Sequence, residues 1–216
     1  MARMQRSLLP AIRDLCVQIA SALPEIPGRG RTILITSALD GEGKSVVAAG
    51  LATQLAGLGG GRILLVDAQS RRPMVHDLIG VEPNCGFTRR LAGEPWEACV
   101  VPAPTAITRG QLDCLSGGDS KVATALANRD LVRDFLGEAA IRYAWTIIDG
   151  GACGRGRLDA LPFAVDGVVL VVDSLRTKRE IVQDAIDHLG LAPGRLLGVV
   201  LNQQDFPIPD FLYRRL

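Results

Sequence analysis

The chain has 216 residues, of which 48% are apolar and 22% are charged. That balance fits one globular domain with a full core, at most with a small appendage, and it excludes disorder over most of the length. Twenty-four Lys and Arg residues against 23 Asp and Glu residues leave a net charge of +1, which excludes a wholly basic surface, so we expect no nucleic-acid partner.

The first element expected along the chain is an amphipathic helix over residues 8–23. Residues 24–31 are rich in Pro and Gly, which predicts a linker. We therefore expect an N-terminal helix and linker over residues 1–30, a main domain over residues 31–203 and a C-terminal tail over residues 204–216. The helix prediction depends on apolar residues at three- and four-residue spacing, namely Leu8, Leu9, Ile12, Leu15, Ile19 and Leu23.

Short apolar runs alternate with helical patterns from residue 32 onward. Strands that alternate with helices predict a doubly wound, mostly parallel sheet with both faces covered, which is an α/β fold. Ligands of such sheets bind at the carboxyl ends of the strands. The expected strands are residues 32–36, 62–66, 145–148, 167–172 and 195–201, and the expected helices are residues 44–58, 129–144 and 179–189.

Cysteine usage and the distribution of apolar residues bear on the compartment. The number of cysteines is odd and none form a C-x-x-C pair, which argues against a zinc site or a disulfide framework and favours a reducing compartment. No uninterrupted apolar run approaches ~18 residues, and the N-terminus lacks the pattern of a signal peptide. We therefore expect a cytoplasmic protein. The cysteines are Cys16, Cys85, Cys99, Cys114 and Cys153.

The most informative segment is residues 38–45, ALDGEGKS, between an expected strand and an expected helix. It matches the phosphate-binding pattern G-x-x-x-x-G-K-[ST], with Ala38 in place of the first glycine. Gly41 and Gly43 let the backbone curl so that successive N–H groups point at phosphate oxygens. The alternative is a chance glycine-rich turn, which the flanking strand and helix make the weaker interpretation.

Two side chains of this loop have predicted roles of their own. Lys44 supplies a mobile positive charge for the outer phosphates, and the Ser45 hydroxyl is a ligand for Mg²⁺. The predicted cofactors are therefore ATP and Mg²⁺. The alternative for Lys44 is an ordinary surface lysine. The residues of this loop expected to contact the nucleotide are Gly41, Glu42, Gly43, Lys44, Ser45 and Val46.

Two aspartates end predicted strands at the same edge of the sheet. Asp67 follows the strand over residues 62–66, and Asp149 follows the strand over residues 145–148. A carboxylate at the tip of a buried strand beside a phosphate loop can hold Mg²⁺ directly or through water. We therefore expect both aspartates to be metal ligands and, with Lys44, to be catalytic. The alternative is that each aspartate caps the turn after it.

Five strings of the sequence add up to a known pattern. They are ITSALDGEGKS at residues 35–45, LLVDA at 64–68, RRP at 71–73, IID at 147–149 and GVVLN at 198–202. Together they resemble the bacterial tyrosine kinases, also called BY-kinases, over nearly the whole chain. The RRP string after the second strand is the one that separates these kinases from the related MinD and ParA ATPases.

The resemblance implies a P-loop fold, binding of Mg·ATP and, in many members, autophosphorylation of a tyrosine cluster in the C-terminal tail from subunit to subunit. It also implies control of the length and export of capsular polysaccharide or exopolysaccharide. The implied partner is a membrane polysaccharide co-polymerase on a separate chain, which would hold this protein at the inner face of the membrane. Asn202 is implied to contact the adenine ring; the alternative is an ordinary turn residue after the last strand.

Two departures from the family pattern concern the expected site. The family's second motif is D-x-D, but Gln69 stands at its second carboxylate, and an amide can neither take up a proton nor bring negative charge to a metal. Gly150 and Gly151 follow Asp149 where the family has Ser or Thr and two prolines. We therefore expect a weaker kinase reaction and a more flexible loop after Asp149.

Two further departures concern autophosphorylation and assembly. The tail holds a single tyrosine, Tyr213, as the candidate phosphosite, and Tyr143 is expected in the core. In the family's ring-forming helix motif E-x-x-R-x-x-R, Arg13 matches the first arginine, but Pro10 and Cys16 stand at the acid and at the second arginine. The contact that would build a homo-oligomeric ring is therefore expected to be missing or altered.

These departures leave the phosphate loop intact. The expected function is a Mg·ATP-binding regulator of exopolysaccharide biosynthesis and export, of capsule or holdfast type, with tyrosine kinase activity weak or lost. The alternative is a positioning ATPase like MinD or ParA, against which Leu39 speaks because it replaces the second loop lysine of those proteins. A third interpretation is a nucleotide-free scaffold that keeps only the fold.

Overall fold

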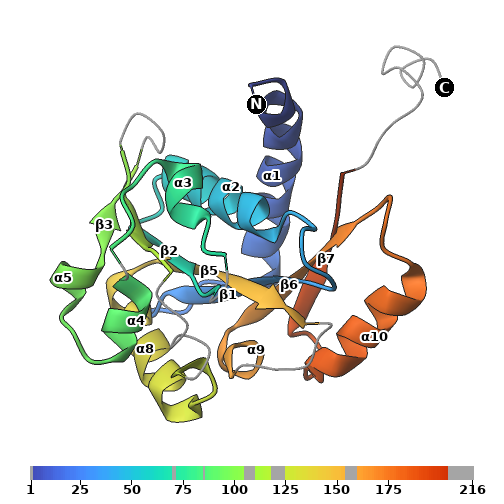
Figure 1. The fold of residues 1–216 in the computed structure, drawn as a ribbon. Helices are drawn as coiled ribbons and strands as arrows, with labels where there is room; N and C mark the ends of the chain where they lie inside the picture. Colours follow the sequence, from blue (N-terminus) through green and yellow to red (C-terminus); the bar gives the residue numbers. More distant parts are fainter. Residues whose placement is uncertain are drawn as a thin grey trace.

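A seven-stranded sheet forms the centre of the protein in a computed structural model (Figure 1). The strand order is β3-β4-β2-β5-β1-β6-β7, and the pairs are parallel except for β3 with β4. The predicted α/β fold with a mostly parallel sheet is confirmed. The strands are β1 (Arg31–Ser37), β2 (Ile63–Asp67), β3 (Val101–Pro102), β4 (Leu112–Leu115), β5 (Trp145–Ala152), β6 (Gly167–Asp173) and β7 (Leu196–Asn202).

The structure describes residues 2–69, 72–84, 86–104, 110–117, 125–153 and 160–203, with side chains in the first helix from residue 10 onward. Within these residues no helix is long and apolar enough to cross a membrane. The helices are α1 (Ala2–Ala22), α2 (Lys44–Gly57), α3 (Val75–Ile79), α4 (Gly86–Leu91), α5 (Trp96–Cys99), α8 (Arg129–Arg142), α9 (Leu161–Ala164) and α10 (Arg179–Leu189).

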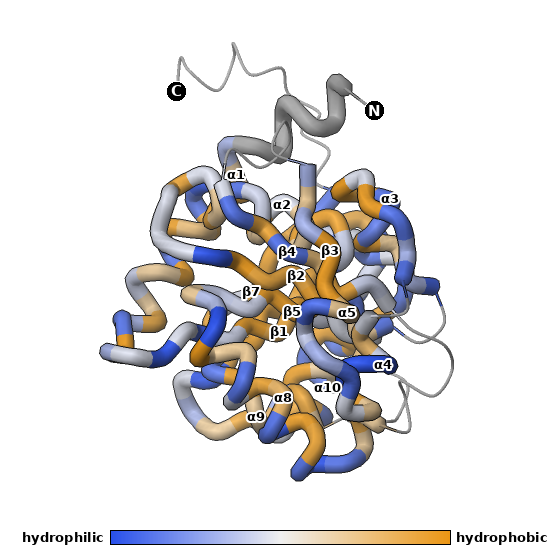
Figure 2. The backbone as a smooth tube through the Cα atoms, turned by 90° about the vertical axis from the view of Figure 1, so that its left-hand side faces the viewer, coloured by the Kyte–Doolittle hydropathy of each residue, from blue (hydrophilic) through white to orange (hydrophobic). Residues whose placement is uncertain are grey.

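Helices cover both faces of the sheet. Figure 1 shows α1, α2 and α3 on one face and α4, α8, α9 and α10 on the other. Along β1, Ile33 and Ile35 pack in the first layer, and Leu34 between them packs in the second. Figure 2 shows apolar residues along the strands at the middle of the molecule. Both sides of each central strand are buried, which explains why the strands are continuous apolar runs.

The short elements between β2 and α8 were not predicted from the sequence. These are α3, α4, α5, β3 and β4, which have between two and six residues each. A segment that short does not complete enough turns or alternations to give a periodic signal. Their positions depend instead on contacts with the sheet and with α8.

Strand β5 is longer than predicted and runs through Gly150 and Gly151 to Ala152. At Gly150 a Cβ atom would lie 2.7 Å from Cδ1 of Leu34 on β1, so a larger residue here would require the Leu34 side chain to shift. Beyond that point Ser37 pairs with Ala152 across a bulge. The prediction of a loop directly after Asp149 is therefore wrong, because the two glycines continue the strand.

Helix α1 packs on α2 through the positions that bear on ring assembly. Ile12 and Cys16 are buried in the layer between the two helices, whereas Arg13 is exposed. Burial raises the pKa of the Cys16 thiol to about 11. Cys16 stands where the family's second ring arginine is expected, and its side chain is buried within the chain.

Candidate nucleotide and metal site

The residues of the phosphate-binding pattern form the loop that joins β1 to α2. Strand β1 is central in the sheet, with β5 on one side and β6 on the other. Gly41 and Gly43 have φ angles of +84° and +90°, a region that glycine adopts without strain. At Gly43 a Cβ atom would lie 2.1 Å from Nδ2 of Asn202. No side chain caps the first turn of α2, so the positive end of that helix faces the loop. This geometry is suited to an anion such as phosphate.

The side chain of Glu42 is buried in the protein and is 2% exposed. One carboxylate oxygen accepts a hydrogen bond from the backbone N–H of Leu39 at 2.6 Å. The other accepts from the N–H of Asp173 at 3.0 Å and from the Thr177 hydroxyl. Glu42 therefore braces the loop against the end of β6. Sequence reasoning missed this role, because Thr177 lies 135 residues away.

Asn202, at the end of β7, also holds the loop. Its Nδ2 donates a hydrogen bond to the backbone carbonyl of Glu42 at 2.8 Å. The residue pairs with Asp173 across β6 and β7, and its own carbonyl accepts from the N–H of Ser174 at 3.0 Å. Asn202 thus contacts the phosphate loop directly, and its contact with an adenine ring stays a prediction.

Three side chains from separate elements meet beside the loop. Gln69, two residues beyond β2, donates from Nε2 to the hydroxyl of Ser45 at 2.9 Å and to Oδ2 of Asp149 at 2.8 Å. Asp149 is fully buried on β5, and its second oxygen, Oδ1, has no hydrogen-bond partner. The structure therefore brings together the predicted metal ligands Ser45 and Asp149. Gln69, which replaces the family's second carboxylate, is hydrogen-bonded to both.

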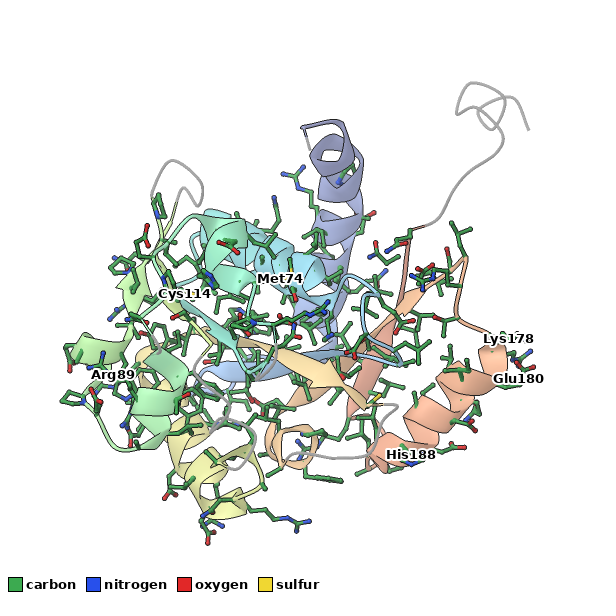
Figure 3. All side chains as sticks on the ribbon, viewed as in Figure 1. Met74, Arg89, Cys114, Lys178, Glu180 and His188 are labelled. Carbon is green, nitrogen blue, oxygen red and sulfur yellow. The ribbon has the colours of Figure 1, made fainter. Side chains whose placement is uncertain are left out.

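Asp67 is the neighbour of Asp149 in the sheet register, and it is also fully buried. Its Oδ2 accepts hydrogen bonds from the N–H groups of Met74 at 2.9 Å and Val75 at 3.1 Å, at the start of α3, where Figure 3 labels Met74. Its Oδ1 accepts from the N–H of Gln69 at 3.1 Å. Burial raises the pKa of Asp67, and these three donors oppose the rise. Asp67 anchors α3 to the sheet, and its role toward a metal stays a prediction.

Burial dominates the electrostatics of Asp149. It raises the pKa of this carboxyl from 3.8 to about 6, against the hydrogen bonds from Ser45 and Gln69, which lower it. The charge of Asp67 raises the pKa further, and the charge of Lys44 lowers it. Lys44 itself is 5% exposed at the start of α2, so it is part of this site and is no ordinary surface lysine.

The donor set fits a hard divalent cation. A buried carboxylate oxygen without a partner and a neighbouring hydroxyl are oxygen ligands of the kind Mg²⁺ prefers. Ser45 and Asp149 are the residues that would hold it. No group of three or more His, Cys, Asp or Glu side chains able to bind a metal occurs among the described residues. Water molecules and phosphate oxygens of a nucleotide would therefore complete the coordination shell.

The remaining predicted positions lie beside the loop, in the core or outside the described residues. Val46 is exposed on the first turn of α2, and Leu39 packs against the core. Tyr143 is buried, as expected, and its hydroxyl donates to Oδ2 of Asp113 at 3.0 Å. The candidate phosphosite Tyr213 lies outside the described part of the chain.

No protein-family model matches the chain. Over 182 residues it is 32% identical to the succinoglycan biosynthesis transport protein ExoP of Rhizobium meliloti, which covers 81% of this chain and 22% of ExoP. Over 174 residues it is 32% identical to the tyrosine-protein kinase YwqD of Bacillus subtilis, which covers 80% of this chain and 72% of YwqD. The chain therefore spans about a fifth of the length of ExoP and most of the length of YwqD.

Solved structures show the same architecture. The kinase domain of VpsO superposes with a TM-score of 0.69 at 26% identity, over 90% of this chain and 97% of that domain. The septum site-determining protein MinD of Pyrococcus horikoshii, complexed with Mg-ADP, superposes with a TM-score of 0.59 at 22% identity, over 86% of this chain and 76% of that protein. At that level of identity, MinD shows the fold alone.

Replacing Glu42 with Ala is expected to destabilise the fold. The substitution leaves the N–H groups of Leu39 and Asp173 and the Thr177 hydroxyl without their acceptor. Buried donors left unsatisfied cost about 3 kcal/mol together, which lowers the melting midpoint by roughly 6–12 °C in a chain of this size. Calorimetric melting measures the change. The exposed Glu82→Ala is the matched control, and equal midpoints for both variants would contradict the bracing role.

Replacing Asp149 with Asn is expected to stabilise the metal-free protein at about pH 7.5. The folded-state pKa of about 6 lies above the value of 3.8 for an unperturbed carboxyl, so wild-type stability falls as the pH rises through this window. The asparagine avoids that penalty of about 3 kcal/mol and raises the melting midpoint by several degrees.

The pH dependence of that difference is the check. It should shrink as the pH falls from about 6 to below 3.8, where the wild-type carboxyl becomes protonated in both states. A difference that is constant from about pH 4 to 8 would show that the charge of Asp149 is not its cause.

Proposed function

The chain belongs to the family of bacterial tyrosine kinases, and from this premise we propose that it binds Mg·ATP and regulates exopolysaccharide biosynthesis and export. The observation that carries the proposal is the meeting of Ser45 and Asp149 beside a glycine loop at the start of α2. The loop supplies N–H groups and a helix terminus for phosphate, Lys44 supplies positive charge, and Ser45 with Asp149 would hold Mg²⁺. Bound Mg²⁺ would neutralise phosphate charge.

The tyrosine kinase reaction is proposed to be weak or lost. A kinase has to position a tyrosine hydroxyl and accept its proton. Gln69 occupies the place of the family's second carboxylate, and its amide cannot accept that proton. The tail contains only one tyrosine, Tyr213. Binding of the nucleotide, rather than phosphate transfer, is then the main event, and it acts by shifting the population of conformations of the loops around the site.

The proposed partner is a membrane polysaccharide co-polymerase on a separate chain, which would place this protein at the inner face of the membrane. Support comes from the similarity to ExoP, which is named for succinoglycan biosynthesis and transport and of which this chain spans 22%. A role as a positioning ATPase has less support. MinD is similar in fold alone, and Leu39 packs against the core where MinD and ParA proteins carry a second loop lysine.

Replacing Lys44 with Ala is expected to weaken ATP binding about ten-fold or more, because a charge-assisted hydrogen bond to phosphate contributes roughly 1.5–3 kcal/mol. Titration calorimetry with Mg·ATP measures the affinity. Lys178→Ala is the matched control, because Lys178 is exposed at the start of α10 (Figure 3). Equal affinities of wild type and Lys44→Ala would contradict the assignment of Lys44, and a wild type that does not bind would favour the scaffold interpretation.

Incubation with Mg·ATP is expected to leave Tyr213 and the buried Tyr143 unmodified, because the amide of Gln69 does not take up a proton. Mass spectrometry of the incubated protein detects phosphotyrosine at either position, with Tyr213→Phe as the control for site assignment. Stoichiometric phosphorylation of Tyr213 in wild type would refute the loss of kinase activity and leave nucleotide binding in place.

A further inference from the structure

The amide of Gln69 donates hydrogen bonds to both side chains that would hold a metal ion. Its Nε2 carries two hydrogens, and it donates one to the Ser45 hydroxyl at 2.9 Å and one to Oδ2 of Asp149 at 2.8 Å. An ionised carboxylate can only accept hydrogen bonds, so the amide must present its nitrogen, and not its oxygen, to Asp149.

A divalent cation would compete for the same electron pairs. Mg²⁺ binds at about 2.0–2.1 Å from its oxygen ligands and demands a near-octahedral arrangement. One N–H group points at the Ser45 oxygen and another at Oδ2 of Asp149, where a cation would also bind, whereas Oδ1 of Asp149 has no partner. A cation that uses Oδ2 of Asp149 or the same lone pair of Ser45 therefore has to displace the amide of Gln69.

The charges around the site point the same way. Asp67 and Asp149 are buried carboxylates, and Lys44 is the buried cation at the start of α2. A carboxylate at position 69 would add a third negative charge next to the phosphates, which a metal ion would have to offset. The neutral amide instead donates two N–H groups to oxygens that the metal ion would otherwise coordinate.

We propose that Gln69 acts as an internal substitute for the metal ion. It holds Ser45 and Asp149 together when no metal is bound. Nucleotide binding therefore depends less on a divalent cation than it would if position 69 carried a carboxylate. In this sense Gln69 determines how strongly nucleotide binding depends on the metal ion. This inference rests on the proposed nucleotide-binding function.

The test compares ADP affinity in EDTA with ADP affinity in MgCl₂ by titration calorimetry. In wild type, the ratio of the two dissociation constants should be small. In Gln69→Asp, ADP should bind more weakly in EDTA and more tightly in MgCl₂, so that the ratio rises about ten-fold or more. Gln183→Asp is the matched control, because it makes the same change on the exposed side of α10 and should leave the ratio unaltered.

The outcomes separate this inference from the proposed function. If wild type and Gln69→Asp give the same ratio of ADP dissociation constants, the role of Gln69 is overturned and nucleotide binding stands.

If wild type binds ADP in neither buffer, the proposed function fails, and MnCl₂ without nucleotide becomes the probe. Mn²⁺ should then raise the melting midpoint of Gln69→Asp and not that of wild type, and equal shifts would overturn the inference. If Gln69→Asp does not fold, Gln69→Glu takes its place in both measurements.

Discussion

The burial of carboxylates at one edge of the sheet is the constraint on which the rest of this structure depends. Glu42, Asp67, Asp149 and Asp173 are each at most 2% exposed. An ionised carboxylate removed from water is costly unless hydrogen-bond donors or cations surround it. The backbone around the phosphate loop and the start of α3 supplies many of those donors. The conformation of these segments follows from the need to satisfy the buried charges.

The loop that would receive phosphate is consequently held from several directions. Glu42 connects it to the end of β6 and to Thr177 just before α10, and Asn202 connects it to the end of β7. These groups come from elements far apart in the sequence, so the loop is shaped before a ligand arrives. They also give the loop a physical connection to α10, whose outward side carries Lys178, Glu180 and His188 (Figure 3).

Membership of the bacterial tyrosine kinases does not by itself decide which reaction this chain performs. The glycine loop, Lys44 and Ser45 that we propose to bind phosphate are present, whereas the position expected to assist proton transfer carries Gln69. In the structure that amide donates hydrogen bonds to Ser45 and Asp149. The replacement therefore has a structural effect of its own, beyond the loss of a carboxylate. A family member that uses nucleotide binding as a signal needs the first set of groups and not the second.

The sequence by itself determined the parallel α/β sheet, the phosphate loop and the two aspartates that pair across β2 and β5, although Asp149 lies inside β5 and not at its end. Those features have local signals: continuous apolar runs, glycines at fixed spacing and a carboxylate directly after a strand. Only the tertiary structure decided that Glu42 braces the loop, that Asp67 anchors α3 and that Gln69 joins Ser45 to Asp149. Their partners include groups up to 135 residues away, and no local pattern records which distant donor will face a buried acceptor. The extension of β5 through Gly150 was decided in the same way, because the side chain of Leu34 on β1 approaches Gly150 only once the two strands are paired.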